Sequence, residues 1–294
     1  MFEELSPPAD QVCSTPGILQ NADPRCWRAH RFGLPRPRWN QLYGRAFWVT
    51  GAGSGYGRSI ALALAAGGAT VFLTGRRIEK LRETQDEGVS LGISRQNCIP
   101  ITANITLEPD LKRAVGVISQ HVTQLHGLVN SAALPQPNTG PYPLANQSLS
   151  SWTQLLTTNV TAQWLTSRAA LPLLANSGSL RMLFLSSEAG WAATPGFGPY
   201  NLSKSAVNTL GTSFAAECST HYPAIDVQIN VIVPGEALTE MNRGSTESPY
   251  CVVSIALALL SHPPKGPNGR FFHRDGRHLG FAYSDRYAKN LLEE

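Results

Sequence analysis

From residue 45 onward, short apolar runs rich in β-branched and aromatic residues alternate with longer helix-forming stretches. The expected strands are AFWVT (46–50), TVFLT (70–74), CIPIT (98–102), GLVNSA (127–132), LRMLFLS (180–186), VQINVIV (227–233) and GRFFH (269–273). The expected helices occupy 56–66, 78–87, 108–121, 150–174, 200–219 and 249–261. This alternation predicts right-handed strand–helix–strand units, hence a Rossmann-type α/β fold. We expect one doubly wound, mostly parallel sheet of seven strands with helices on both faces.

A glycine-rich loop, VTGAGSGYGRSIALAL, joins the first expected strand to the first expected helix. Glycines allow a tight turn there and let backbone N–H groups approach a phosphate, while the helix N-terminus adds partial positive charge. Glycine-rich turns after strands are common, so a plain tight turn is the alternative, but the position between the first strand and the first helix favours dinucleotide binding. The loop residues expected to hold the cofactor are Gly51, Gly53, Ser54, Gly55, Tyr56 and Gly57.

The end of the second expected strand, LTGRR, indicates which dinucleotide binds. A carboxylate at Thr74 or Gly75 would grip the ribose 2′-hydroxyl of NAD, and this sequence has none. Arg76 instead offers a planar guanidinium suited to a 2′-phosphate, with Arg77 or Arg58 able to assist. The sequence therefore predicts NADP(H) as the cofactor, although arginines at a strand end are also common surface residues.

The chain before the first strand has a different character. Residues 1–43 are rich in proline, arginine and aromatic residues and show no clean period. We interpret them as an irregular N-terminal arm that packs on the body or on a partner subunit. Residues 44–294 then form a single dinucleotide-binding and catalytic domain.

Composition excludes several classes of protein. The net charge is only +4 and no basic run is interleaved with aromatics, so we expect no nucleic-acid partner. Charged residues reach 15%, which argues against a disordered chain. The start, MFEELSPPAD, lacks the features of a signal peptide, and no stretch is long and apolar enough to span a membrane, so no membrane partner is expected.

The cysteines and histidines indicate neither disulfides nor a metal. The five cysteines form no C-x-x-C pair, and an odd, scattered set is typical of reduced thiols in a cytoplasmic protein. His273 and His278 flank RDGR without the spacing of metal ligands on a helix, so we expect them to be surface or structural residues. No metal site is predicted.

Tyr200 and Lys204 in YNLSK stand four residues apart, which places both side chains on one face of a helix. A free tyrosine has a pKa near 10, and a nearby cation favours the phenolate and lowers that pKa. The pair is therefore a candidate proton-transfer device. Taken alone, the pair is better explained as exposed residues with solvated tips, and only its position behind Ser187 and the glycine loop favours proton transfer.

Several motifs in a fixed order resemble the short-chain dehydrogenase/reductase family in its roughly 250-residue form. The resemblance covers about residues 45–276. The motifs are TGAGSGYG (50–57), LVNSAA (128–133, with Ala133 where the family has glycine), TTNV with Asn159, LSSEAG, YNLSK and VPGEALT. Each is weak alone, but their order and spacing together are specific.

The resemblance implies the catalytic set Asn159, Ser187, Tyr200 and Lys204. In the family the serine lies 13 residues before the tyrosine, which selects Ser187 over its neighbour Ser186. Tyr200 would donate a proton to the alkoxide formed from a ketone and act as base in the reverse direction. Ser187 would hydrogen-bond the substrate oxygen, and Asn159 would hold a water that links Lys204 to solvent.

Further cofactor contacts follow from the resemblance. Asn130 would lie beside the adenosine ribose, and Thr239, after Pro234 and Gly235, would bond the nicotinamide carboxamide. Asn104 and Ile105 sit near the expected adenine, where the family usually has an acid followed by an aliphatic residue. An amide at position 104 can still accept from the adenine amino group. Tyr200 and Lys204 would also contact the nicotinamide ribose.

The family often pairs two helices across subunits, and the matching helices here carry more apolar positions than one sheet face needs. These positions are Leu155, Leu156, Trp164, Leu165, Val207, Leu210 and Phe214. We therefore expect a homodimer or homotetramer, with packing inside one subunit as the alternative.

The sequence predicts an NADP-dependent short-chain oxidoreductase that reduces a small-molecule ketone or oxidises a secondary alcohol. The segment EMNRGSTES is short for a substrate lid, and sugar, polyketide, steroid-like and acyl-carrier ketones all stay open. The alternative class is a non-catalytic NADP(H)-binding sensor or scaffold, which need not keep the four catalytic residues. An epimerase or dehydratase is a weaker option, because its relatives usually show G-x-x-G-x-x-G.

Overall fold

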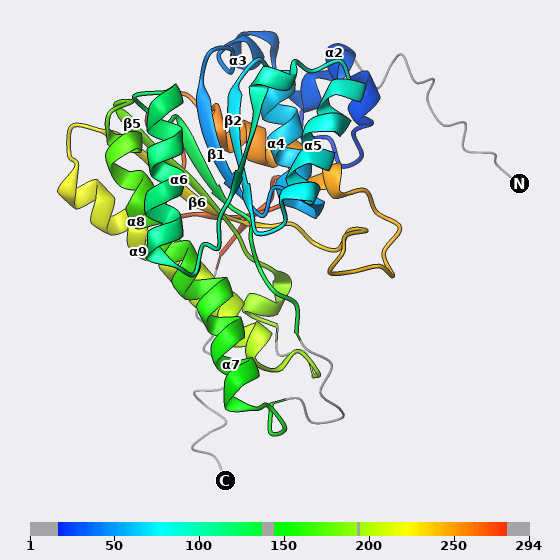
Figure 1. The fold of residues 1–294 in the computed structure, drawn as a ribbon, viewed down its shortest axis with the longest axis vertical. Coiled ribbons are helices and arrows are strands. Elements are labelled where there is room, and N and C mark those ends of the chain that lie inside the picture. Colours follow the sequence, from blue (N-terminus) through cyan, green and yellow to red (C-terminus); the bar gives the residue numbers. More distant parts are fainter. Residues whose placement is uncertain (1–16, 137–143, 193–194, 281–294) are drawn as a thin grey trace, which may run out of the picture.

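A computed structural model of the chain describes residues 17–136, 144–192 and 195–280 (Figure 1). One sheet of eight strands runs through this part of the chain in the order β3-β2-β1-β4-β5-β6-β7-β8. The strands are β1 (Ala46–Thr50), β2 (Thr70–Gly75), β3 (Cys98–Thr102), β4 (Gly127–Asn130), β5 (Ser179–Leu185), β6 (Asp226–Val233), β7 (Phe271–His273) and β8 (His278–Leu279). The predicted doubly wound, mostly parallel fold is confirmed, and β8, antiparallel to β7, is an eighth strand that the sequence did not indicate.

Helices cover both faces of the sheet (Figure 1). They are α4 (Gly55–Ala66), α5 (Ile78–Ser90), α6 (Glu108–His121), α7 (Leu149–Leu156), α8 (Ala162–Ala175), α9 (Gly198–His221) and α10 (Val253–Leu260), with a π turn at Thr157–Thr161 and short 3-10 turns at Arg95–Asn97, Glu188–Gly190 and Pro249–Val252. The predicted helix over 150–174 is therefore divided by a wide turn into α7 and α8.

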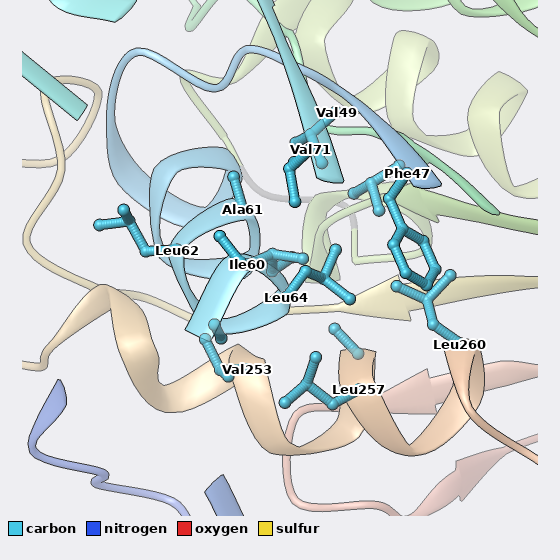
Figure 2. Close-up of a cluster of buried hydrophobic side chains, with 14 of the residues drawn as sticks. Phe47, Val49, Ile60, Ala61, Leu62, Leu64, Val71, Val253, Leu257 and Leu260 are labelled. Atoms are coloured by element: carbon cyan, nitrogen blue, oxygen red, sulfur yellow. The ribbon is translucent and has the colours of Figure 1, made fainter. Parts of the chain in front are cut away.

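Each face of the sheet carries its own apolar core. All five residues of β1 are buried, as expected of a central parallel strand covered on both sides. On one face, Figure 2 shows side chains of α4 and α10 meeting those of β1 and β2, with Ile60 and Leu64 packed toward Leu257. On the other face, α6, α8 and α9 cover Trp48, Phe72 and Phe184.

The described part of the N-terminal segment, residues 17–43, is not irregular throughout. It holds the short helices α2 (Trp27–His30) and α3 (Arg36–Asn40) and two 3-10 turns at Pro24–Cys26 and Arg31–Gly33. Phe32 is buried and stacks on Tyr250 at a centroid distance of 6.0 Å, and Arg38 donates to the Ser261 carbonyl at 3.2 Å. These residues pack on the body of the same chain, beside α10; residues 1–16, with Cys13, lie outside the described residues.

The strand order places a crevice for ligand binding at the carboxyl ends of β1 and β4. β1 pairs with β2 on one side and with β4 on the other, so the connections that leave β1 and β4 separate above their carboxyl ends. Open α/β sheets bind ligands at such a switch point. The glycine loop after β1, the arginines after β2 and Asn130 at the end of β4 all lie at this edge.

Candidate active site

The glycine loop approaches the chain that leaves β4 so closely that side chains are excluded. Gly51 has a φ of +67°, and a Cβ on it would lie 2.8 Å from both the N and Cα atoms of Ala132. A Cβ on Gly57 would lie 2.4 Å from the Gly51 carbonyl oxygen. The tight turn expected at this loop is therefore present, and it leads directly into the N-terminus of α4.

A cavity of about 590 Å³ lies over this loop. It is lined by nine of the predicted cofactor residues: Gly51, Gly53, Ser54, Gly55, Tyr56, Arg76, Asn104, Ile105 and Thr239. The size suits a cofactor site, and glycine loop, helix N-terminus and arginines provide the donors that a dinucleotide phosphate requires.

The other predicted cofactor residues do not line this cavity. Asn130 is fully buried and donates from Nδ2 to the Ser167 hydroxyl at 2.9 Å, while its Oδ1 has no hydrogen-bond partner among the described residues. A buried amide oxygen without a partner carries a cost unless a ligand or water donates to it. The Gly235 carbonyl accepts from the Tyr56 hydroxyl at 2.8 Å, and the Pro234 carbonyl accepts from Cys251 Sγ at 3.9 Å.

The three arginines considered for the 2′-phosphate have different surroundings. Arg76 is exposed and lines the cavity. Arg77 also lines it but donates to the Glu240 carboxylate at 2.5 Å. Arg58 is half-buried and donates to the Gly53 carbonyl at 2.5 Å and to Glu87 at 3.3 Å, so it helps to hold the glycine loop.

The predicted adenine contacts, Asn104 and Ile105, lie together on the cavity wall. The Asn104 side-chain oxygen accepts from the backbone N–H and the hydroxyl of Thr106, at 3.2 and 2.9 Å. An amide oxygen has two lone pairs, so an adenine amino group would compete with these bonds. Ile105 is buried and offers an apolar wall.

Tyr200 is 8% exposed and lies near the N-terminus of α9. Its hydroxyl lies 3.9 Å from Met241 Sδ and also hydrogen-bonds Ser187, which follows the end of β5. Burial raises the pKa of Tyr200 to about 12, and the bond to Ser187 only partly opposes this. The lowered pKa that we expected for this phenol is therefore wrong for this arrangement.

Lys204 explains that difference. Its Nζ lies 5.5 Å from the centroid of the Tyr200 ring, but it donates to the Leu185 carbonyl oxygen at 2.9 Å. The amine is buried, and this desolvation lowers the pKa of Lys204 from 10.5 to about 8. The helical spacing does place both side chains on one face, but the amine bonds a strand carbonyl.

Asn159 lies in the π turn between α7 and α8 and is fully buried. Its Oδ1 accepts from the Leu134 N–H at 2.7 Å, and its Nδ2 donates to the Leu134 carbonyl at 3.0 Å and to the Ser203 hydroxyl at 3.1 Å. The residue thus ties the loop after β4 to α9, one residue before Lys204. π turns often occur at functional sites, but the water that we assigned to Asn159 stays a prediction.

The sequence did not single out Glu240 or Met241, which follow the predicted contact Thr239. Both line the cavity: Glu240 faces Arg77, and the thioether of Met241 lies beside the Tyr200 hydroxyl. Their position directly after the VPGEALT motif was the available signal.

Other predictions about the surface have mixed outcomes. Leu155, Leu165 and Val207 are buried in this single chain, whereas Trp164 is 40% exposed. The homo-oligomer stays a prediction.

Cys26, Cys98, Cys218 and Cys251 are free thiols. Among the described residues there is no group of His, Cys, Asp or Glu that could hold a metal, and no helix that could cross a membrane.

Known proteins are similar to this chain in sequence and in fold. The family description "short chain dehydrogenase" matches residues 45–249. An 11-beta-hydroxysteroid dehydrogenase 1A of Arabidopsis thaliana is 31% identical over 69% of this chain, and the match spans 55% of that protein, about half its length. The uncharacterized oxidoreductase YciK of Escherichia coli (strain K12) is 30% identical over 84% of this chain and 98% of its own.

A solved structure gives the same result for the fold. The crystal structure of an Escherichia coli CFT073 protein described as a short chain dehydrogenase, complexed with NADPH, is 26% identical. It superposes with a TM-score of 0.71 and covers 80% of this chain and 98% of its own. The chain therefore belongs to the short-chain dehydrogenase/reductase family of oxidoreductases.

Proposed function

We propose that this protein is an NADP(H)-dependent carbonyl reductase, with Tyr200 as the proton donor to the substrate oxygen. The observation that carries the proposal is the grouping of Tyr200, Ser187 and Lys204 at the carboxyl ends of the strands, next to a cavity lined by the glycine loop and Arg76. The complex of a structural relative with NADPH supports the choice of cofactor.

The residues around the cavity fit a dinucleotide. The glycine loop and the N-terminus of α4 would hold the pyrophosphate, Arg76 the 2′-phosphate, and Asn104 with Ile105 the adenine. When bound, reduced nicotinamide supplies the hydride.

The high pKa of Tyr200 suits the reductive direction. With a pKa of about 12, the phenol stays protonated at neutral pH and has a proton to donate. The Ser187 hydroxyl can turn from Tyr200 to a substrate oxygen and stabilise its developing charge. Lys204 Nζ, 5.5 Å from the centroid of the Tyr200 ring, would bind the nicotinamide ribose beside the phenol.

A panel of carbonyl compounds, followed by NADPH absorbance, tests the function. The panel should contain sugar, polyketide, steroid-like and acyl-carrier ketones, since the named relatives include a hydroxysteroid dehydrogenase. We expect oxidation of NADPH with at least one class. Tight NADPH binding without turnover on any of them would instead favour the non-catalytic sensor or scaffold.

Changing Arg76 to Asp is expected to reverse the cofactor preference. The substitution removes the guanidinium and places a carboxylate where it repels a 2′-phosphate and accepts from a 2′-hydroxyl. Loss of a charge-assisted bidentate contact should weaken NADPH binding about 30-fold or more, while NADH binding improves. Isothermal titration of both cofactors measures this. Arg82→Asp on α5, exposed and outside the cavity lining, is the control; an unchanged NADPH/NADH ratio in Arg76→Asp would discard the assignment.

A further inference from the structure

The segment after β6, residues 235–247, lies against the glycine loop. Thr239 is so close to Gly55 that a Cβ on that glycine would lie 3.0 Å from the Thr239 methyl carbon. The Tyr56 hydroxyl bonds the Gly235 carbonyl at 2.8 Å, as described above. The segment also folds on itself, since the Leu238 N–H donates to the Glu247 carbonyl at 2.8 Å and the Thr239 N–H to the Asn242 carbonyl at 3.0 Å. Its side chains therefore border the site where phosphates are expected.

Glu240 reaches from this segment to the end of β2. Its carboxylate accepts from Arg77 at 2.5 Å and also hydrogen-bonds Ser54, the residue before α4. The Arg77 guanidinium above all, together with the charge of Lys80 and the Ser54 hydroxyl, holds the pKa of this carboxyl below its usual value. Glu240 is therefore ionised at neutral pH, with its charge among the donors at the rim of the cavity.

The partners of Glu240 lie at the rim of the cavity where a 2′-phosphate is expected. Arg77 directly follows Arg76 at the end of β2, and both line the cavity with Ser54 and Glu240. The Arg77 and Glu240 side chains remain 53% and 41% exposed, so a ligand at the rim can reach the pair. A guanidinium binds a carboxylate or a phosphate through two parallel hydrogen bonds, so the two anions compete for the same N–H groups.

We propose that Glu240 is an internal counter-anion that competes with the 2′-phosphate of NADP(H) for Arg77 and so restrains the preference of this site for NADP(H) over NAD(H). The inference rests on the proposed function, because it takes this cavity as the dinucleotide site. NADP(H) must displace Glu240 from Arg77 to gain that contact, whereas NAD(H), which lacks the phosphate, leaves the ion pair in place. Glu240 is thus a specificity-determining residue contributed by the segment after β6.

Glu240→Gln tests the competition by isothermal titration of the full-length protein. NADPH binding should tighten about three- to fivefold, as expected for releasing an exposed ion pair, and NADH binding should change less than about twofold. The gain should shrink at high salt, where exposed charges are screened. Adenosine 2′,5′-bisphosphate, which lacks the nicotinamide half, should gain as NADPH does. The control is Glu79→Gln, which removes an exposed carboxylate near Arg77 that lies outside the cavity lining.

A double-mutant cycle separates competition from a general change in charge. In an Arg77→Gln background, Glu240→Gln should leave the NADPH dissociation constant unchanged, because the contested guanidinium is gone. An unchanged or weaker NADPH affinity in Glu240→Gln, an equal gain for NADH, or an equal gain in Glu79→Gln would overturn the proposal. If the unaltered protein bound neither dinucleotide, the proposed function itself would be overturned. If the unaltered protein bound NADPH normally and Glu240→Gln did not change that binding, only the role of Glu240 would be overturned.

Discussion

Replacing Tyr200 with Phe is expected to lower NADPH-dependent ketone reduction by about a thousandfold, in line with the loss of a positioned general acid. The ring stays in its buried place beside Met241, so the fold should not change. The loss should appear in kcat, because only the proton that moves in the transition state has been removed. The NADPH dissociation constant should stay within about threefold of that of the unaltered protein, since one hydrogen bond at most is lost.

The matched control is Tyr222→Phe at the far end of α9, where the same hydroxyl is removed away from the cavity. Turnover in that variant should be normal. A Tyr200→Phe protein that keeps near-normal turnover would rule out Tyr200 as the proton donor, whatever ketone is used.

Replacing Lys204 with Met should nearly abolish turnover and yet stabilise the protein at neutral pH. Burial lowers the pKa of Lys204 from 10.5 to about 8, which corresponds to a cost of about 3 kcal/mol for keeping the amine charged below pH 8. Methionine cannot donate to the Leu185 carbonyl, and loss of that hydrogen bond destabilises the variant by about 1 kcal/mol. The net stabilisation of roughly 2 kcal/mol should raise Tm by about 4–8 °C.

The pH dependence of this effect has a defined sign. Between pH 8 and pH 10.5 the unfolded chain keeps the Lys204 proton while the folded chain loses it, so the stability of the unaltered protein rises with pH across that window. The advantage of Lys204→Met should therefore be greatest below pH 8 and fade toward pH 10.5. Thermal melts at several pH values measure it, with Lys112→Met, on the exposed side of α6, as the control. If Lys204→Met were less stable at pH 7 than the unaltered protein, burial of the charged Lys204 amine would not destabilise the fold.

The fold was predictable because the strands consist of compact β-prone runs, so that β1 and β3 begin and end where expected. β4 ends two residues earlier than predicted, at Asn130, for a tertiary reason. The N–H groups of Ser131 and Ala132 donate to the Thr50 hydroxyl at 3.2 and 3.3 Å and so leave the strand ladder. The close packing of Gly51 on Ala132 requires that path, and no local pattern reveals it.

The sequence could indicate which side chains would lie close together, but not their electrostatics. The spacing of Tyr200 and Lys204 correctly placed both on one face of α9. It could not indicate that burial would raise the pKa of the phenol or that the amine would bond the Leu185 carbonyl, which lies 19 residues away in sequence. The pairing of Arg77 with Glu240 joins residues 163 positions apart, a distance at which no motif operates.

The wide turn at Thr157–Thr161 determines where this chain tolerates redesign. An α-helix rotates about 100° for each residue, so deleting one residue from this turn would swing α7 around relative to α8 and pull Asn159 off Leu134. Figure 1 shows α7 reaching away from the sheet, and Gln154 in it lines the cavity. The outer end of α7 lies before this turn, so it can be lengthened or exchanged to alter what enters the cavity. Asn159 would keep its bonds to Leu134 and Ser203, and the orientation of α8 would not change.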